Sequence, residues 1–94
     1  MFKVELSKRF QKQLRKLPRW IQKKVMEEIE LLKSNPEFGE KLKGVLSDIR
    51  KIRVHNYRVA YKVHSSNETI HVFFVDHRKR AYQELKRLRR EEVI

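Results

Sequence analysis

Two alternating segments that flank a short turn constrain the fold of this chain more than any other feature. Between residues 51 and 64, hydrophobic and mainly cationic residues alternate on both sides of His55-Asn56. Such alternation is typical of half-buried β-strands, whose successive side chains point to opposite faces. A two-residue turn at this dipeptide pairs Val54 with Tyr57 and keeps the hydrophobic residues of both strands on one face. The pattern predicts an antiparallel hairpin with a fixed register.

The same register gathers positive charge on the other face of the hairpin. It places Arg53 directly opposite Arg58, with Lys51 two residues away on the same face. Like charges that face each other across strands destabilise a sheet by about 0.2–1 kcal/mol. Charge alone leaves two interpretations open. The two guanidinium groups extend into water, or they form a preorganised site for an anion such as phosphate, which Arg binds through paired hydrogen bonds.

The rest of the chain predicts a single α+β domain that covers residues 1–94, with the element order β-α-α-β-β-β-α. Two amphipathic helices meet at Pro18 and form an αα-hairpin, which begins with Ser7 as a helix cap. We expect this helical hairpin to pack on a mainly antiparallel four-stranded sheet. The expected strands and the final helix cover, in order, residues 2–6, 48–54, 57–64, 69–75 and about 79–91.

Composition favours a negatively charged partner. The chain of 94 residues carries 24 Lys and Arg against 12 Asp and Glu, a net charge of +12. This surplus points first to nucleic acid, then to an acidic protein and last to a membrane. We expect no membrane association, because the longest wholly hydrophobic run, Val72 to Val75, is far too short to span a bilayer. The charged N-terminus lacks a signal-peptide pattern, so a cytoplasmic location is expected.

The sequence indicates neither a metal site nor a reactive thiol. The absence of cysteine excludes a disulfide framework, a Cys-based zinc site and a thiol nucleophile. His55, His64 and His71 have neither Cys partners nor the helical spacing of a metal site. We therefore expect no bound metal and no cofactor.

Longer motifs extend the hairpin pattern over nearly the whole chain. They are Lys-Leu-Pro at 16–18, Lys-Leu-Lys-Gly at 41–44, Arg-Val-His-Asn-Tyr-Arg-Val-Ala-Tyr at 53–61 and His-Arg-Lys-Arg-Ala-Tyr at 77–82. In this order and spacing the chain resembles the RelE/ParE superfamily of toxin–antitoxin toxins, and the RelE ribonuclease branch most of all. It departs from that pattern at His55, where relatives usually carry Gly in the turn.

The resemblance implies a RelE-like fold and an endoribonuclease that cleaves mRNA in the ribosomal A site without a metal and so inhibits translation. By motif position, the implied catalytic residues are Lys51, Arg53, Arg58, Arg78 and Tyr82. Contacts with RNA are expected at Lys43, His77 and Lys62. The implied partners are a cognate acidic antitoxin, ribosome-bound mRNA and rRNA. A ParE-like toxin that inhibits gyrase, and a non-catalytic RNA- or ribosome-binding module, are the alternatives.

Several roles remain open within the implied site. Cleavage needs a base for the 2′-hydroxyl, cations for the charge on phosphorus and an acid for the leaving oxygen. Tyr82 or Lys51 is the candidate base, and Arg78 or His77 the candidate partner of the leaving group. Each also has an ordinary structural interpretation: Tyr82 as a packing residue at the edge of a helix and His77 as a helix cap. Trp20 is expected in the core of the helical hairpin or in contact with an antitoxin, rather than as an exposed stacking platform.

Overall fold

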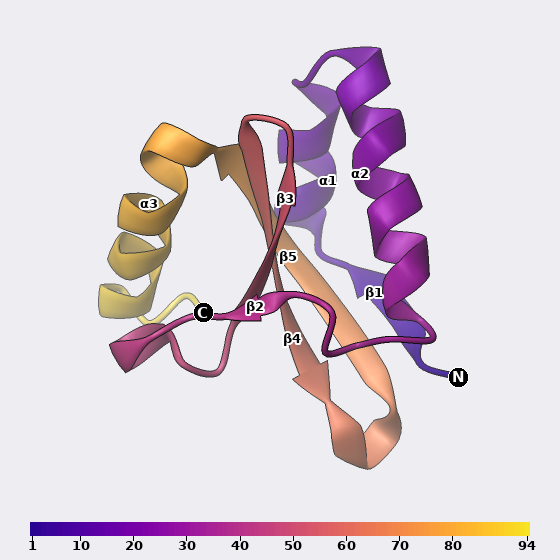
Figure 1. Ribbon diagram of the computed structural model, residues 1–94. Coiled ribbons are helices and arrows are strands. Elements are labelled where there is room, and N and C mark those ends of the chain that lie inside the picture. The colour runs from indigo at the N-terminus through magenta and orange to yellow at the C-terminus, as the bar shows by residue number, and fades with distance from the viewer.

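The computed structural model describes residues 1–94 as three α-helices and a five-stranded sheet (Figure 1). The elements in chain order are β1 (Lys3–Leu6), α1 (Lys8–Arg15), α2 (Arg19–Leu32), β2 (Glu40–Lys41), the short 3-10 helix η1 (Gly44–Leu46), β3 (Arg50–Val54), β4 (Tyr57–His64), a second 3-10 helix η2 (Ser65–Asn67), β5 (Thr69–His77) and α3 (Arg78–Arg90). The spatial order of the strands is β1-β5-β4-β3-β2. Only the β1–β5 pair is parallel, which confirms the α+β class and the mainly antiparallel sheet.

The sheet has one more strand than predicted. The additional strand, β2, is two residues long and pairs Glu40 with Lys51 at the edge of the sheet. Two residues are too few to show alternation, so no sequence pattern could reveal this strand. The predicted strand 48–54 begins later, because the N–H of Ile49 bonds to the carbonyl of Leu46 in a turn. Strand β5 is longer than the predicted strand 69–75, because it continues to His77, which pairs with Tyr57.

The predicted register of the β3–β4 hairpin is confirmed. Val54 lies opposite Tyr57, and Arg53 lies opposite Arg58. His55 has a φ of 53°, in the left-handed region, and so makes the tight turn.

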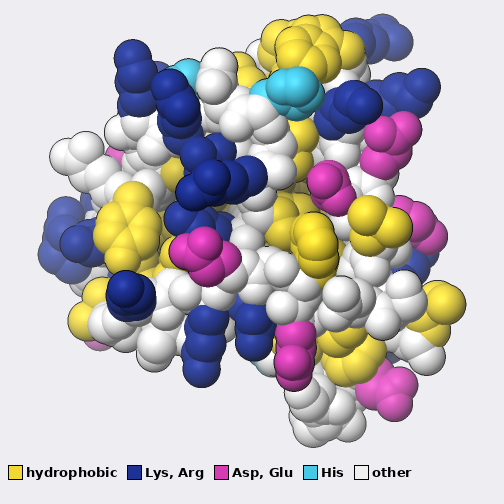
Figure 2. Space-filling view, in the orientation of Figure 1, with side chains coloured by type: hydrophobic (Ala, Val, Ile, Leu, Met, Phe, Trp, Pro, Cys, Tyr) yellow, Lys and Arg dark blue, Asp and Glu magenta, His cyan; other side chains and the backbone are white.

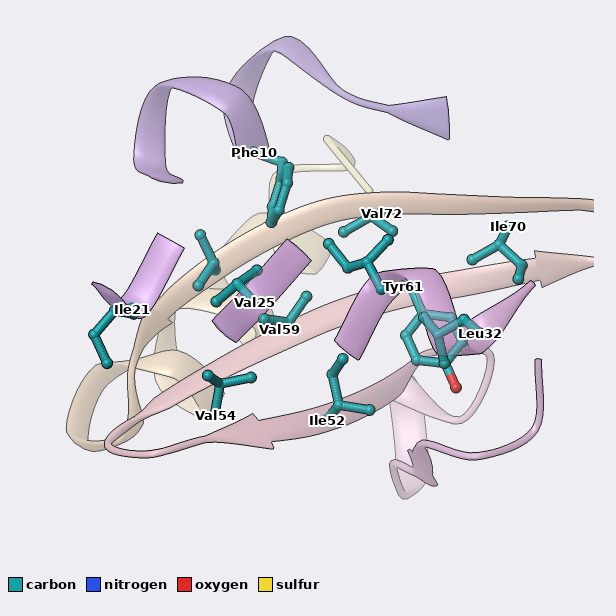
Figure 3. Packing of buried hydrophobic residues seen from close by; sticks show 12 residues of the cluster. Phe10, Ile21, Val25, Leu32, Ile52, Val54, Val59, Tyr61, Ile70 and Val72 are labelled. Carbon is teal, nitrogen blue, oxygen red and sulfur yellow. The ribbon is translucent and has the colours of Figure 1, made fainter. Parts of the chain in front are cut away.

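Helices cover both faces of the sheet. Helices α1 and α2 pack on one face, whereas α3 and η1 pack on the other (Figure 1). The first face buries hydrophobic side chains such as Phe10, Val25 and Val59 (Figure 3). The second face buries Phe74 and Leu85 among others. Both faces of the central strand β5 are covered, and this strand is accordingly hydrophobic on both sides. On β3, nearer the edge of the sheet, Arg53 stays exposed.

Helix α1 begins with the predicted cap. The hydroxyl of Ser7 accepts a hydrogen bond from the N–H of Phe10 at 3.0 Å. We expect Ser7→Ala to lower the free energy of unfolding by about 1 kcal/mol, because an N–H group at the start of the helix loses its partner. Urea denaturation measures this change. Ser66→Ala, at an exposed position in η2, is the control, and equal stability of the two variants would contradict the capping role.

Candidate functional site

Three arginines from three elements meet beside the turn of the β3–β4 hairpin. Arg53 on β3 faces Arg58 on β4, and Arg78 is the first residue of α3. The backbone N–H of Arg78 bonds to the carbonyl of Asn56 at 2.7 Å, which fixes the start of α3 against the hairpin turn. We call Arg53, Arg58 and Arg78 the cationic cluster. Figure 2 shows Lys and Arg side chains gathered over this part of the sheet and beside α3.

No carboxylate forms an ion pair with the cationic cluster. The structure contains seven ion pairs, and none of them involves Arg53, Arg58 or Arg78. Partial burial lowers the pKa of the Arg58 guanidinium below its ordinary value, and the charges of Arg53 and Arg78 lower that pKa further. An anion bound here would relieve this repulsion, so the arrangement suits a phosphate group.

The guanidinium of Arg58 is held in place by the backbone. Its Nη1 donates to the carbonyl of Tyr57 at 2.9 Å and to that of His55 at 3.2 Å. The side chain is half-buried, whereas Arg53 and Arg78 are exposed. A fixed arginine between two solvent-facing arginines favours the anion-site interpretation over guanidinium groups that simply extend into water.

Tyr82 lies on α3 one turn after Arg78. Residues four apart on a helix share one side, so Arg78, Tyr82 and Lys86 form a stripe that starts at the cationic cluster. The Nζ of Lys86 lies over the phenol ring, 4.9 Å from its centroid. The residue is 43% exposed, and the neighbouring Ala81 makes the contact with the core. Tyr82 is therefore accessible to a ligand bound at the cluster, in a cationic setting.

Lys51 lies on β3, two residues from Arg53 and on the same face. Its Nζ is 3.8 Å from a carboxylate oxygen of Glu40 on β2. Because no sequence pattern indicates strand β2, this partner was not predicted. Lys51 and Arg53 both line a groove that also includes Glu28 and Phe38. Lys51 therefore lies near the cationic cluster, on the same strand as Arg53, although Glu40 partly balances its charge.

His77 caps the helix that carries Arg78 and Tyr82. Its Nδ1 accepts a hydrogen bond from the N–H of Lys79 at 3.2 Å, which confirms the capping interpretation. The imidazole also meets the ring of Tyr57 edge-on, with 5.6 Å between the centroids. Only Nε2 is then left for a contact with RNA or for proton transfer.

The structure does not bring Lys62 to the cationic cluster. Lys62 lies four residues beyond Arg58 on β4, about 13 Å along the strand. Its Nζ is 3.4 Å from a carboxylate oxygen of Asp48 and lies over the ring of Phe73. Lys43 precedes η1, is exposed and has no ion-pair partner. Contacts of these two lysines with RNA stay predictions.

The structure contains no cluster of metal-binding side chains. No three side chains among His, Asp and Glu come together in an arrangement that could hold a metal ion. His64 and His71 lie with their ring centroids 6.5 Å apart and have no third ligand. None of the helices has the length and hydrophobicity needed to cross a bilayer.

Known proteins are similar to this chain in both sequence and fold. Residues 4–82 match the family described as the ParE toxin of the type II toxin–antitoxin system parDE. The chain belongs to the RelE/ParE superfamily of type II toxin–antitoxin toxins. A Methanocaldococcus jannaschii protein named for the toxin RelE1 is 37% identical over 87 residues, which cover 87% of this chain and 96% of that protein. The resemblance stated from the motifs is confirmed.

Solved structures of RelE toxins place this toxin within the same fold. In the RelBE2 toxin–antitoxin complex of Mycobacterium tuberculosis, the matching chain is 28% identical, with a TM-score of 0.75, and the match covers 82% of this chain and 98% of that one. In the RelB–RelE complex of Methanococcus jannaschii, the identity is 31% and the TM-score 0.67, with 84% and 95% covered. The RelE-like fold predicted for this RelE/ParE toxin is therefore correct.

Proposed function

We propose that this toxin is an endoribonuclease that cleaves mRNA in the ribosomal A site and thereby inhibits translation in the cytoplasm. The observation that carries the proposal is the cationic cluster, three converging arginines that form no ion pair, one helical turn away from the exposed Tyr82. Such a site suits a phosphodiester, whose charge grows as the 2′-oxygen attacks phosphorus. Side chains alone can supply this chemistry, so the proposed reaction needs no metal or cofactor.

The chain offers a group for each step of the reaction. Tyr82 or Lys51 takes the proton of the 2′-hydroxyl, whose oxygen then forms a bond to phosphorus. Arg53 and Arg58 bind the phosphate oxygens, and Arg58 is already fixed by the backbone. As the bond to the 5′-oxygen breaks, Arg78 stabilises that oxygen or Nε2 of His77 gives it a proton. RNA on either side of the cut contacts Lys43 and, farther along, Lys62.

We also infer that a cognate acidic antitoxin binds this toxin. The net charge of +12 favours an acidic partner, and solved structures of relatives are complexes of a toxin with its antitoxin. An antitoxin that covers the cationic cluster would block access of RNA to it.

The matching family supports a second candidate, a toxin that inhibits gyrase. That family is described by its ParE toxin, and the resemblance implies gyrase as the target of the ParE branch. A translating extract that contains a supercoiled plasmid distinguishes the two targets. The ribonuclease leaves cut mRNA and intact plasmid, whereas the gyrase inhibitor leaves intact mRNA and broken DNA. A non-catalytic RNA- or ribosome-binding module would leave both molecules whole.

Salt provides an independent test of how the cluster binds RNA. Each phosphate neutralised by Lys or Arg releases counterions, so the binding constant should fall steeply as the salt concentration rises. With three to five phosphate contacts, we expect a slope of about −2 to −4 in a plot of log K against log salt for a single-stranded oligonucleotide. Fluorescence anisotropy of a labelled oligonucleotide measures this slope. A flat response would refute the electrostatic account.

A further inference from the structure

Trp20 is exposed at the start of α2. Its residue surface is 56% exposed, and the core positions of this helix are taken by Ile21 and Val25 instead. The expectation that Trp20 lies in the core of the helical hairpin was therefore wrong, because the helix turns its neighbour Ile21 inward. Trp20 is the only tryptophan of the chain, and a large aromatic surface in water is a typical recognition feature.

The tip of the β3–β4 hairpin places His55 against Trp20. The two ring centroids are 4.7 Å apart, and the rings meet at 79°. In an edge-on pair of this kind, one ring points its edge at the other, so at least one face of the indole remains uncovered. The backbone of His55 has a φ of 53°, a conformation that costs free energy for a residue with a side chain. The hairpin thus keeps an imidazole at a position that would suit glycine better.

Charged residues of both signs surround the two rings. Lys23 and Lys24 follow Trp20 by three and four residues, so they lie on its side of α2. A groove of about 440 Å³ runs between α2 and the hairpin. It is lined by the cations Lys24 and Arg53, by His55 and by the carboxylates Glu27 and Glu28. Arg53 belongs both to this groove and to the cationic cluster. The groove therefore leads from His55 to the candidate active site through Arg53, with cations and carboxylates both along it.

We propose that Trp20 and His55 form a stacking platform for a nucleobase of single-stranded RNA whose phosphates lie along the cationic cluster. The proposal rests on the proposed function, since it extends the path of the RNA substrate beyond the cut. Proteins hold unpaired bases with exposed aromatic side chains that lie close to cations for the phosphates, here Lys23, Lys24 and Arg53. A hydrophobic segment of an antitoxin is the competing occupant, but the groove offers it only Leu31 and Val54 among mainly charged side chains.

Paired oligonucleotides test the platform directly. The first is a fluorescein-labelled single-stranded RNA with 2′-O-methyl groups, which cannot be cut, and the second is its abasic counterpart with the same phosphates. Wild-type protein should bind the base-bearing probe about tenfold more tightly than the abasic one, whereas Trp20→Ala should bind both equally weakly. Trp20→Phe should recover part of the preference. Val45→Ala, another exposed hydrophobic position, should behave as wild type. Binding should also change the fluorescence of Trp20.

His55→Gly separates recognition from stability. Relief of the left-handed backbone should leave the melting temperature unchanged or higher, while the preference for the base-bearing probe falls severalfold. A purely structural histidine would give the opposite pattern. Equal affinity of the wild type for both probes, or no binding of either, would overturn the platform. So would a Trp20→Ala variant that loses affinity only for the antitoxin.

Failure of the stacking platform and failure of the ribonuclease assignment give different results. If wild-type protein leaves ribosome-bound mRNA intact but still prefers the base-bearing probe, the platform stands and the ribonuclease assignment fails. If the wild type and Trp20→Ala cut mRNA at the same rate, and the wild type binds the base-bearing and abasic probes equally, the ribonuclease assignment stands and the platform fails.

Discussion

Arg58→Ala should slow cleavage of ribosome-bound mRNA by about 100-fold or more. Removal of a single preorganised donor from a site that stabilises growing negative charge typically costs this much. Arg58 is the half-buried member of the cationic cluster, and two backbone carbonyls fix its guanidinium. The single-turnover rate of cleavage at saturating toxin measures the effect. Affinity for the ribosome should change far less, since many other cations remain.

The fold should survive this change. Arg58 has no ion-pair partner, and its neighbours Arg53 and Arg78 repel it, so its removal should leave the melting temperature unchanged or slightly raised. Arg15→Ala, at an exposed position at the end of α1, is the matched control and should cleave as wild type. Tyr82→Phe removes one hydroxyl and should also lose most of the cleavage if that hydroxyl is the base. Full activity of both Arg58→Ala and Tyr82→Phe would refute the assigned roles.

Tyr61→Phe should cause a large loss of stability from the change of a single atom. The hydroxyl of Tyr61 donates to the carbonyl of Pro36 at 2.8 Å and accepts from the N–H of Gly39 at 2.8 Å. The ring is fully buried at one end of the larger core cluster (Figure 3). Without the hydroxyl, both backbone groups lose their partner where water has little access. Each such group costs about 1–3 kcal/mol.

We therefore expect the free energy of unfolding of Tyr61→Phe to fall by about 2–4 kcal/mol. For a domain of this size the melting temperature should drop by roughly ten degrees or more. Tyr57→Phe is the control, because the hydroxyl of Tyr57 has no hydrogen-bond partner within the protein. Gly39→Ala should act in the same direction, since a Cβ there would lie 2.5 Å from the Tyr61 hydroxyl. Equal melting temperatures of the two Tyr→Phe variants would show that the hydroxyl does not anchor the loop.

Local sequence patterns account for most of the fold. Alternation around His55 predicted the register of the β3–β4 hairpin, because a slip of one residue would bury Arg53 and Arg58. The cap at Ser7 was predicted equally well, since it depends only on residues within one turn. Strand β2 could not be predicted, because its pairing with β3 is decided by the path of the loop that Tyr61 holds.

The candidate site depended more on tertiary structure. The pairing of Arg53 with Arg58 follows from the hairpin, but the approach of Arg78 depends on its backbone bond to Asn56, which no pattern reveals. The exposed position of Trp20 was not predicted, for a related reason. Helical periodicity identifies the inward stripe that begins at Ile21, yet the partner of a residue next to that stripe is set by the hairpin tip.

The central claim, that the cationic cluster binds the phosphate that is cut, is tested most directly by the chemistry of the RNA ends. Attack by the 2′-oxygen must leave a 2′,3′-cyclic phosphate on one fragment and a 5′-hydroxyl on the other. Wild-type toxin in a translating extract should produce these ends within A-site codons, and Arg58→Ala should produce almost none. Intact mRNA with the wild-type toxin, or the same yield of these ends from Arg58→Ala, would contradict the account.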